Sequence, residues 1–291
     1  QCSVYTEQVW RAARDLSSGR AGWNALAPLP AVPVRGCNHV GVDTTWATVR
    51  GRSLAASCTL TDGRLLITGG QVCYPDMEDP FPTHYTRYTS SAATFDFNTG
   101  AWTVIASMHT CRCGHAIGVL LDGRVIVVGG EEEAFDEDPP EPTTTTAEIY
   151  DPISDSWTVV SGPIWPDFGR TTMPRDYVGF AGCVSADGKF TISGGSMYTG
   201  GFEYEVLRKL RQKASGGDEE AEDRLQEADA RSPMATVQCY DPATDSWAQE
   251  LPDMVEVHCG HFMGRAGNDL VVYDDCRLEE GGRVKLELFE S

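Results

Sequence analysis

Basic residues are scarce in this chain of 291 residues, which has 23 lysines and arginines against 43 aspartates and glutamates. The resulting net charge of −20 argues against a nucleic-acid partner, because the phosphate backbone would be repelled at every approach. Long apolar runs are also missing, and none approaches the roughly 18 residues that a membrane-spanning helix needs. No leader segment, P-loop, Rossmann glycine pattern or Ser-His-Asp spacing is evident. We therefore expect no membrane insertion and no function carried by a common catalytic motif.

The cysteines are spread through the chain and do not form a compact framework. Three of them, Cys58, Cys183 and Cys239, lie inside apolar runs, where a thiol behaves as a small hydrophobic group. We expect most of the ten cysteines to be reduced, which favours a cytoplasmic protein. The alternative is a secreted, disulfide-bonded protein, since the number of cysteines is even.

A nine-residue phrase occurs three times. It reads DGRLLITGG at 62–70, DGRVIVVGG at 122–130 and DGKFTISGG at 187–195. After each copy come an apolar segment, an acidic turn and a tryptophan, which are Trp102, Trp157 and Trp247. A repeat of this length indicates that one structural unit is copied along the chain.

The second copy predicts four strands. A short apolar run at 115–121 leads to Asp122-Gly123, the signal of a tight hairpin, and to the β-branched run 124–128. The double glycine ends this strand, AEIYD at 147–151 forms a third, and SWTVV at 156–160 forms a fourth after an Asp-Pro turn. Four antiparallel strands per unit are typical of a β-propeller blade.

These residues resemble the Kelch repeat, as found in bacterial Kelch proteins and in the propeller of galactose-oxidase-like proteins. The resemblance covers about 52–291 and implies an all-β fold, a Kelch-type propeller with four to five blades. It also implies that Phe95, Tyr150 or Tyr240 packs with the tryptophan of its own unit between blades. The expected blades are 52–108, 112–163, 175–254 and 258–291.

The last blade has only three expected strands, at 258–264, 269–275 and 284–290. An N-terminal segment, 17–30 with Trp23, has the pattern of a fourth strand, so we expect it to close the ring and remove an exposed sheet edge. Two alternatives remain open. Segments 3–16 and 37–49 would add part of a degenerate fifth blade, or the chain is a piece of a larger ring.

Two insertions interrupt the repeats. The first, the acidic loop 131–142, has seven acids in the eleven residues 131–141, including Glu131, Glu132 and Asp136. It is either a solvated loop or a docking patch for a basic partner. An iron site like that of specifier-type Kelch proteins is disfavoured, because Pro140 stands where that family has histidine. The second insertion, 196–234, predicts a helical hairpin that either has no function or projects to bind a partner.

Three arginines, Arg52, Arg112 and Arg175, recur just before expected first strands. Arginines around a channel mouth would bind an acidic peptide motif or a carboxylate ligand through bidentate hydrogen bonds. The alternative is that each arginine pairs with an aspartate of a neighbouring blade.

Cysteine and histidine also gather before first strands. The phrase CGH occurs at 113–115 and 259–261, and the candidate metal ligands are Cys113, His115, His258, Cys259 and His261. Such residues suit zinc or copper. The stronger interpretation is structural, because Kelch first strands commonly begin with this histidine. We therefore expect no bound metal and no cofactor.

The sequence predicts a non-catalytic interaction module, an adaptor or scaffold that binds another protein through rim loops or the channel mouth. The alternative is a metal-dependent enzyme of the galactose- or glyoxal-oxidase type, or another Kelch enzyme such as a sialate epimerase. The tyrosine–histidine ligand sequence of the oxidases is absent, so their catalytic residues are not assigned to this chain.

Overall fold

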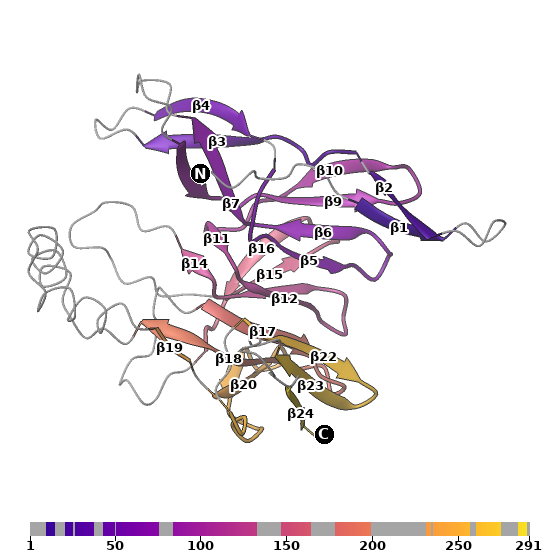
Figure 1. The fold of residues 1–291 in the computed structure, drawn as a ribbon, viewed down its shortest axis with the longest axis vertical. Helices are drawn as coiled ribbons and strands as arrows, with labels where there is room; N and C mark the ends of the chain where they lie inside the picture. The colour runs from indigo at the N-terminus through magenta and orange to yellow at the C-terminus, as the bar shows by residue number, and fades with distance from the viewer. Residues whose placement is uncertain are drawn as a thin grey trace, which may run out of the picture. The chain divides into compact units, whose positions relative to one another are not determined.

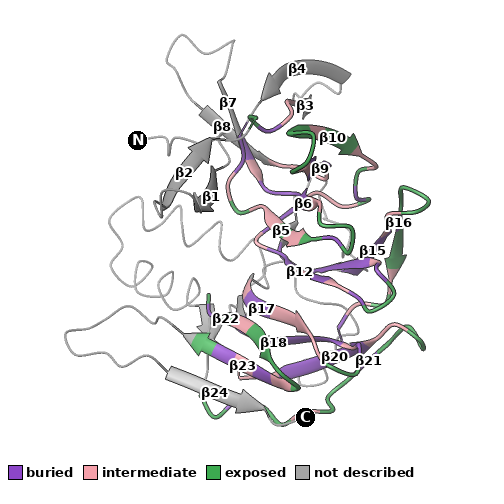
Figure 2. Cartoon of the chain, turned by 90° about the vertical axis from the view of Figure 1, so that its right-hand side faces the viewer, coloured by how far each residue is buried: buried purple, intermediate pink, exposed green. Residues whose placement is uncertain are grey.

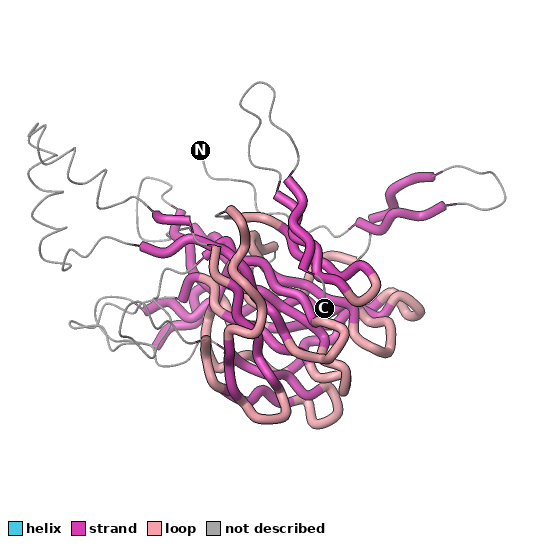
Figure 3. The backbone as a smooth tube through the Cα atoms, turned by 90° about the horizontal axis from the view of Figure 1, so that it is seen from below, coloured by secondary structure: helices cyan, strands magenta, loops and turns pink. Residues whose placement is uncertain are grey.

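The computed structural model describes residues 10–14, 21–25, 27–37, 43–49, 51–75, 84–132, 147–163, 178–198, 231–233, 235–256, 260–274 and 285–289. The chain divides into two compact units, of which the first comprises Gln1–Pro142 with Ala147–Val160 and the second Thr143–Thr146 with Ser161–Ser291. Strands, turns and loops make up the described part, which contains no helix (Figure 3). The expected all-β fold class is confirmed.

The first unit contains two four-stranded antiparallel sheets (Figure 1). In the first sheet the order is β10-β9-β6-β5, with β5 at Ala56–Thr59, β6 at Leu65–Thr68, β9 at Ala92–Asp96 and β10 at Ala101–Ile105. In the second sheet the order is β12-β13-β15-β16, with β12 at Ala116–Val119, β13 at Val125–Val128, β15 at Ala147–Asp151 and β16 at Ser156–Val160. Both sheets have the strand order expected of a propeller blade.

Each first hairpin closes at the Asp-Gly turn that the sequence predicted. In the first sheet Leu60 N donates to Arg64 O at 2.8 Å, and Gly63 has a φ of 85°. Asp62 accepts bonds from the amide and from the side chain of Arg64. The glycine supplies the left-handed conformation and the aspartate fixes the turn, so the hairpin forms from local contacts.

The double glycines are needed for a close approach between chain segments. A Cβ atom on Gly130, whose φ is 88°, would lie 2.4 Å from the carbonyl oxygen of Cys113. A Cβ atom on Gly69 would lie 2.4 Å from the carbonyl oxygen of Arg112, in the segment that begins the next sheet. Any side chain at either position would push these segments apart.

The core of the first unit lies between its two sheets. It combines Leu60 and Leu66 of the first sheet with Val125, Val127 and Trp157 of the second. Figure 2 shows the third strand β15 as buried, whereas the outer strand β16 is mostly exposed apart from Trp157.

Four shorter antiparallel pairings complete the first unit. The strands are β1 (Trp10–Arg14) with β2 (Ala21–Ala25), β3 (Val32–Cys37) with β4 (Asp43–Val49), β7 (Gln71–Pro75) with β8 (His84–Tyr88), and β11 (Arg112–Cys113) with β14 (Glu131–Glu132). The sequence did not predict the β7–β8 hairpin, because it interrupts a repeat between the second and third strands.

The second unit contains the third and fourth sheets. In the third sheet the order is β17-β18-β20-β21, with β19 also paired to β18; the strands are β17 at Val178–Val184, β18 at Phe190–Tyr198, β19 at Arg231–Pro233, β20 at Val237–Asp241 and β21 at Ser246–Ala248. In the fourth sheet the order is β22-β23-β24, with β22 at Phe262–Ala266, β23 at Asp269–Asp274 and β24 at Lys285–Phe289.

Three expectations about the ends and insertions remain predictions. The two ends of the 196–234 insertion, Ser196–Tyr198 and Arg231–Pro233, pair as strands, and the expected helical hairpin lies outside the described residues. The strand with Trp23 pairs with β1, so closure of the last blade by 17–30 stays a prediction. The expected number of four to five blades also remains a prediction.

Candidate functional site

Arg112 is fully buried at the start of the second sheet. Its Nη1 donates to Gly129 O at 2.9 Å, and its Nη2 donates to Glu148 Oε1 at 3.0 Å. Neither side chain is exposed to solvent. The guanidinium therefore connects the first strand, the double glycine and the third strand of one sheet.

Glu148 serves as a common acceptor for this region. Its Oε2 accepts the amide of His109 at 2.7 Å, and its Oε1 accepts the amide of Thr110 at 3.0 Å. Burial by itself raises the pKa of Glu148, but the Arg112 charge and these hydrogen bonds outweigh it and hold the pKa below its usual value. The carboxylate is thus ionised and fixes the segment that enters the second sheet.

Arg52 has the same position in the first sheet without a carboxylate. Its Nη1 donates to Gly69 O at 3.0 Å and to Ser91 O at 3.2 Å. The first sheet has Ala93 where the second has Glu148, each being the second residue of its third strand. Burial lowers the pKa of Arg52 to about 10.

The geometry of Arg52 and Arg112 agrees with the structural alternative, in which arginine pairs within the protein. Both guanidinium groups hold backbone carbonyls, and Arg112 is inaccessible to a ligand. The acid paired with Arg112 is Glu148, which lies in the same expected blade, 112–163, whereas the sequence predicted an aspartate of a neighbouring blade. Arg175 lies outside the described residues.

Two of the predicted histidines form equivalent hydrogen bonds between sheets. His115 Nε2 lies 2.8 Å from Thr68 Oγ1 of the first sheet, and His261 Nε2 lies 2.8 Å from Ser193 Oγ of the third. Each histidine precedes a first strand, and each hydroxyl precedes the double glycine of the sheet before it. Burial, with a contribution from the Arg112 charge, lowers the pKa of His115 to about 3, so this ring is neutral at neutral pH.

The described residues do not gather into a metal centre. No group of three His, Cys, Asp or Glu side chains able to hold an ion occurs among them. Cys113 is buried and His115 is committed to Thr68, whereas His258 and Cys259 lie outside the described part. Cys58, Cys183 and Cys239 are free thiols, and burial raises the pKa of Cys58 to about 12, which suppresses thiolate reactivity.

The acidic segment is anchored at its start. Glu131 and Glu132 form β14, whose backbone pairs with Cys113 and Arg112 of β11. The remainder of the segment, including Asp136, lies outside the described residues. Its first two residues therefore form a short two-stranded sheet with β11, directly after the double glycine.

The tryptophans pack as expected and also make a bond that sequence reasoning missed. The rings of Trp102, Trp157 and Trp247 lie 5.0, 5.1 and 5.3 Å from Phe95, Tyr150 and Tyr240. In addition, Trp157 Nε1 donates to Ala106 O at 2.8 Å, and Trp247 Nε1 donates to Ser161 O at 2.6 Å. Each acceptor lies four residues after the preceding tryptophan, a constant spacing that is visible in the sequence.

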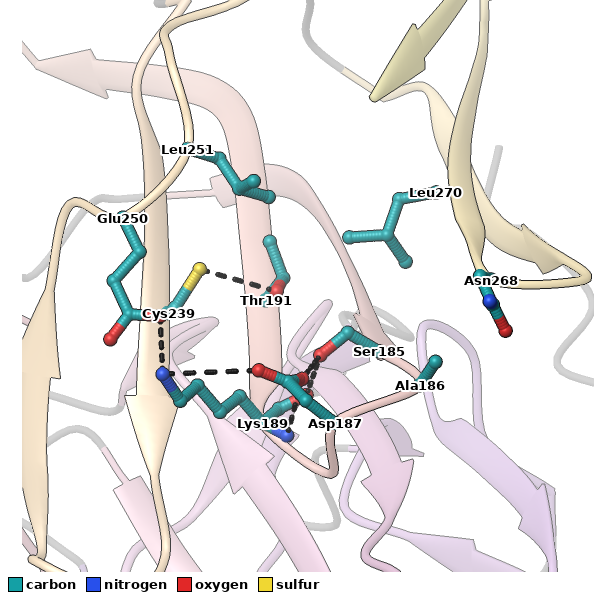
Figure 4. A pocket seen from close by; sticks show the side chains of 10 residues that line it. All are labelled: Ser185, Ala186, Asp187, Lys189, Thr191, Cys239, Glu250, Leu251, Asn268 and Leu270. Atoms are coloured by element: carbon teal, nitrogen blue, oxygen red, sulfur yellow. Dashed lines mark hydrogen bonds and ion pairs between the residues drawn. The ribbon is translucent and has the colours of Figure 1, made fainter. Parts of the chain in front are cut away.

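A cavity of about 500 Å³ opens between the third and fourth sheets of the second unit. Leu251 and Leu270 point toward one another across it (Figure 4). Lys189 forms ion pairs with Glu250 and Asp187 at its edge, and Cys239 Sγ lies 3.4 Å from Thr191 Oγ1 in its wall. The complete lining is Ser185, Ala186, Asp187, Lys189, Thr191, Cys239, Glu250, Leu251, Asn268 and Leu270.

Comparison with known proteins identifies a motif in one part of the chain. Residues 111–163 match the Kelch motif, and they coincide with the second expected blade. Residues 111–163 therefore carry a Kelch motif, and they contain the four strands of the second sheet.

Two curated relatives are similar to part of this chain. The chain is 29% identical over 127 residues to F-box/kelch-repeat protein At1g16250 of Arabidopsis thaliana, which covers 44% of this chain and 30% of that protein. It is 27% identical over 158 residues to Kelch-like protein 15 of Danio rerio, and this match covers 51% of this chain and 23% of that protein. The chain thus spans less than a third of the length of these relatives. In a solved structure, that of YjhT, the similar region covers 97% of this chain and 91% of the other at 13% identity, with a TM-score of 0.44.

The described residues include no helix that is long and apolar enough to cross a membrane.

Proposed function

We propose that this protein is a non-catalytic interaction module that binds a partner protein with a basic surface. The proposal rests on the charge of −20 and on the seven acids of 131–141, a segment whose first two residues are fixed as β14. A cluster of carboxylates at the end of an ordered strand attracts a basic surface and accelerates its association.

The two curated relatives support a protein partner, because both are Kelch-repeat proteins of the F-box or Kelch-like type. Arg52 and Arg112 do not compete as the binding surface, since Arg112 is fully buried and Arg52 nearly so. Their hydrogen bonds hold the sheets together. We therefore assign partner binding to the acidic segment and not to an arginine-lined channel mouth.

The test compares three forms of the full chain, each immobilised and incubated with a cell extract. One form is unchanged, and one carries the seven acids of 131–141 as Gln or Asn. The matched control neutralises the five acids of 218–223 instead. Bound proteins are quantified by mass spectrometry at several salt concentrations.

We expect a set of basic proteins to be retained by the unchanged chain and by the control but lost from the first variant. Retention by all three forms would remove the acidic segment from the interface. If the unchanged chain retains nothing beyond an unrelated acidic protein, the interaction-module proposal fails. Stoichiometric copper, zinc or iron in the purified protein, measured by elemental mass spectrometry, would favour the metal-dependent alternative instead.

A further inference from the structure

Leu54 is a large exposed side chain in a backbone conformation that suits glycine. Its φ is 54°, and its side chain is 60% exposed. The left-handed conformation is unfavourable for leucine, because its Cβ atom approaches a neighbouring carbonyl oxygen. The other described non-glycine residues with a positive φ, Asp155 and Asp245, each accept a tyrosine hydroxyl and a backbone amide. Leu54 has no polar group that could offset its strain in this way.

The other sheets have glycine at the position of Leu54. Gly114 and Gly179 stand, like Leu54, eight residues before the aspartate of an Asp-Gly turn, and their φ values are 62° and 70°. Gly260, with a φ of 75°, precedes β22 by two residues, as Leu54 precedes β5. Gly114 N donates to Leu54 O at 2.8 Å, and Gly260 N donates to Gly179 O at 2.6 Å. The backbone therefore works with glycine here, and the fold does not require a leucine.

Leu54 lies where two inserted segments begin. The residue before it, Ser53, exchanges two backbone hydrogen bonds of 2.9 and 2.8 Å with Gln71, the first residue of β7. Strand β14 begins at Glu131, opposite Cys113, and Cys113 directly precedes the residue that donates to Leu54 O. Both β7 and β14 directly follow a double glycine. Loops that leave a rigid scaffold are the usual carriers of binding, so Leu54 stands at an end of the first unit suited to a partner.

The backbone beside Leu54 is open. A Cβ atom on Gly114 would meet nothing within 4 Å, although Gly114 is the hydrogen-bonded neighbour of Leu54. The double glycines differ in this respect, because a Cβ atom on Gly69 or Gly130 would collide with backbone. A second chain can therefore approach the backbone at Gly114 and reach the leucine side chain.

We propose that Leu54 is the apolar anchor of the partner-binding surface, and that it receives a protein segment with a large apolar side chain next to lysine or arginine. The apolar side chain packs on Leu54, and the segment passes over Gly114. Its basic residues lie toward β14, where the seven acids of 131–141 begin. Interfaces depend on a few anchor side chains within a polar rim, and complementary charge guides the approach. An unfavourable backbone conformation is retained where the side chain makes a functional contact.

This inference rests on the proposed function, because it names the anchor residue of the same interaction. The apolar and the electrostatic parts can nevertheless fail separately. Neutralising the acids of 131–141 changes the charge and leaves Leu54 in place, whereas a change at Leu54 leaves the charge of −20 as it is.

The probe is a library of short random peptides displayed on phage and selected on the immobilised full chain. We expect the selected peptides to carry leucine, isoleucine, methionine, phenylalanine or tryptophan next to lysine or arginine. Selection of basic peptides without a fixed apolar position would support the acidic segment and overturn the anchor at Leu54. If no peptide is enriched over an unrelated acidic protein, both proposals fail.

A selected peptide labelled with fluorescein then reports binding to chain variants by fluorescence anisotropy. We expect Leu54→Gly to weaken binding about tenfold, as removal of an interface anchor does. Leu54→Met keeps a large apolar side chain and should bind more tightly than Leu54→Gly. The matched control is Leu121→Gly, which removes another exposed leucine of the first unit and should leave binding unchanged. Equal binding to Leu54→Gly and the unchanged chain would overturn the proposal.

Thermal unfolding of the same samples separates a partner from the chain itself. If Leu54→Gly lowers the melting temperature, the leucine packs against another segment of this chain and the proposal is wrong. A melting temperature that is unchanged or higher, together with weaker peptide binding, supports it. The loss of binding then does not come from unfolding.

A change at Gly114 tests the path of the partner. Gly114→Asn adds a side chain in the open space beside Leu54, and asparagine tolerates the left-handed conformation. The matched control is Gly260→Asn in the second unit, where the φ is similar and the space is equally open. We expect Gly114→Asn to weaken peptide binding severalfold and Gly260→Asn to leave it unchanged. Equal binding to the two variants would contradict a partner at Leu54.

Discussion

The phenol of Tyr150 donates to Asp155 Oδ1 at 3.0 Å, and the same carboxylate oxygen accepts the amide of Ala106 in the preceding sheet at 3.0 Å. Tyr240 and Asp245 repeat this arrangement, with Ser161 as the amide donor. Asp155 and Asp245 have positive φ values of 49° and 48°. One carboxylate thus ties a turn, an aromatic ring and the neighbouring segment together.

The first sheet lacks both members of this pair. It has Phe95 in place of the tyrosine, and Gly100, with a φ of 69°, in place of the aspartate. We expect Asp155→Gly to relieve the backbone but to lose both hydrogen bonds, which destabilises the protein by about 1–3 kcal/mol.

The measurement is a double-mutant cycle in urea with Tyr150→Phe, Asp155→Gly and the double variant. Because the double variant has the residues of the first sheet, we expect a coupling of about 1 kcal/mol between the two changes. Additive effects would show that the phenol–carboxylate bond contributes nothing.

The double glycine gives a second prediction. Gly130→Ala places a Cβ atom 2.4 Å from the carbonyl oxygen of Cys113 at a φ of 88°, and backbone has to move. We expect a loss of about 3 kcal/mol or more in the free energy of unfolding, since strain and a broken contact add. The control is Gly100→Ala, where the φ is 69° but nothing lies within 4 Å, and the cost should stay near about 1 kcal/mol. Equal losses at the two sites would rule out the close approach as the cause.

The third prediction concerns Leu54, where glycine should give a more stable protein than leucine. It has a φ of 54°, and its carbonyl accepts Gly114 N at 2.8 Å, as Gly179 O accepts Gly260 N at 2.6 Å. The third sheet thus has glycine where the first has leucine, and the leucine side chain is 60% exposed. We expect Leu54→Gly to stabilise the protein by up to about 1 kcal/mol, because the left-handed conformation costs L-residues about 1–2 kcal/mol. The control is Leu121→Gly, because Leu121 is also exposed but does not have a positive φ. We expect this control to destabilise the protein. Thermal unfolding of both variants measures the two effects.

The lowered pKa of His115 predicts that the protein loses stability in mild acid. Its pKa is lowered to about 3 in the folded protein, so between pH 6.5 and 3 the unfolded chain binds one proton more than the folded chain does. The free energy of unfolding therefore falls as the pH falls through this window, by up to about 1.4 kcal/mol per pH unit for this group.

The test of this prediction is Thr68→Val combined with His115→Phe, which replaces the hydrogen-bonded pair of buried side chains by an apolar one. Urea unfolding at pH 6.5 and pH 5 should show a smaller difference for the double variant than for the unchanged protein. An unchanged difference would mean that His115 is not the responsible group.

The buried ion pair gives the fifth prediction. Glu148→Gln removes the negative charge that pairs with the fully buried Arg112 guanidinium. We expect a loss of about 3–5 kcal/mol, because breaking a buried pair leaves one charge uncompensated. Glu148→Leu with Arg112→Met should lose less than Glu148→Gln alone, as measured by urea unfolding. A small loss in the free energy of unfolding for Glu148→Gln would show that the ion pair contributes little to stability.

The sequence by itself determined the local features of this protein. The Asp-Gly turns, the β-branched second strands, the double glycines and the aromatic–tryptophan pairs each depend on residues a few positions apart, so their pattern predicted the repeat and its four strands. The acid-rich segment and the charge were also visible directly.

The tertiary structure alone decided what the polar residues of the repeat do. Arg112 and Glu148 are 36 positions apart, and Thr68 and His115 are 47 apart. Whether an arginine binds a ligand or a buried glutamate depends on which strands fold against each other, and the local pattern is the same in both cases. The hydrogen bond from Trp157 Nε1 to Ala106 O also follows from packing between sheets. The constant spacing of the acceptors is visible in the sequence, but only the structure shows that an indole N–H meets a carbonyl at Ala106 and Ser161.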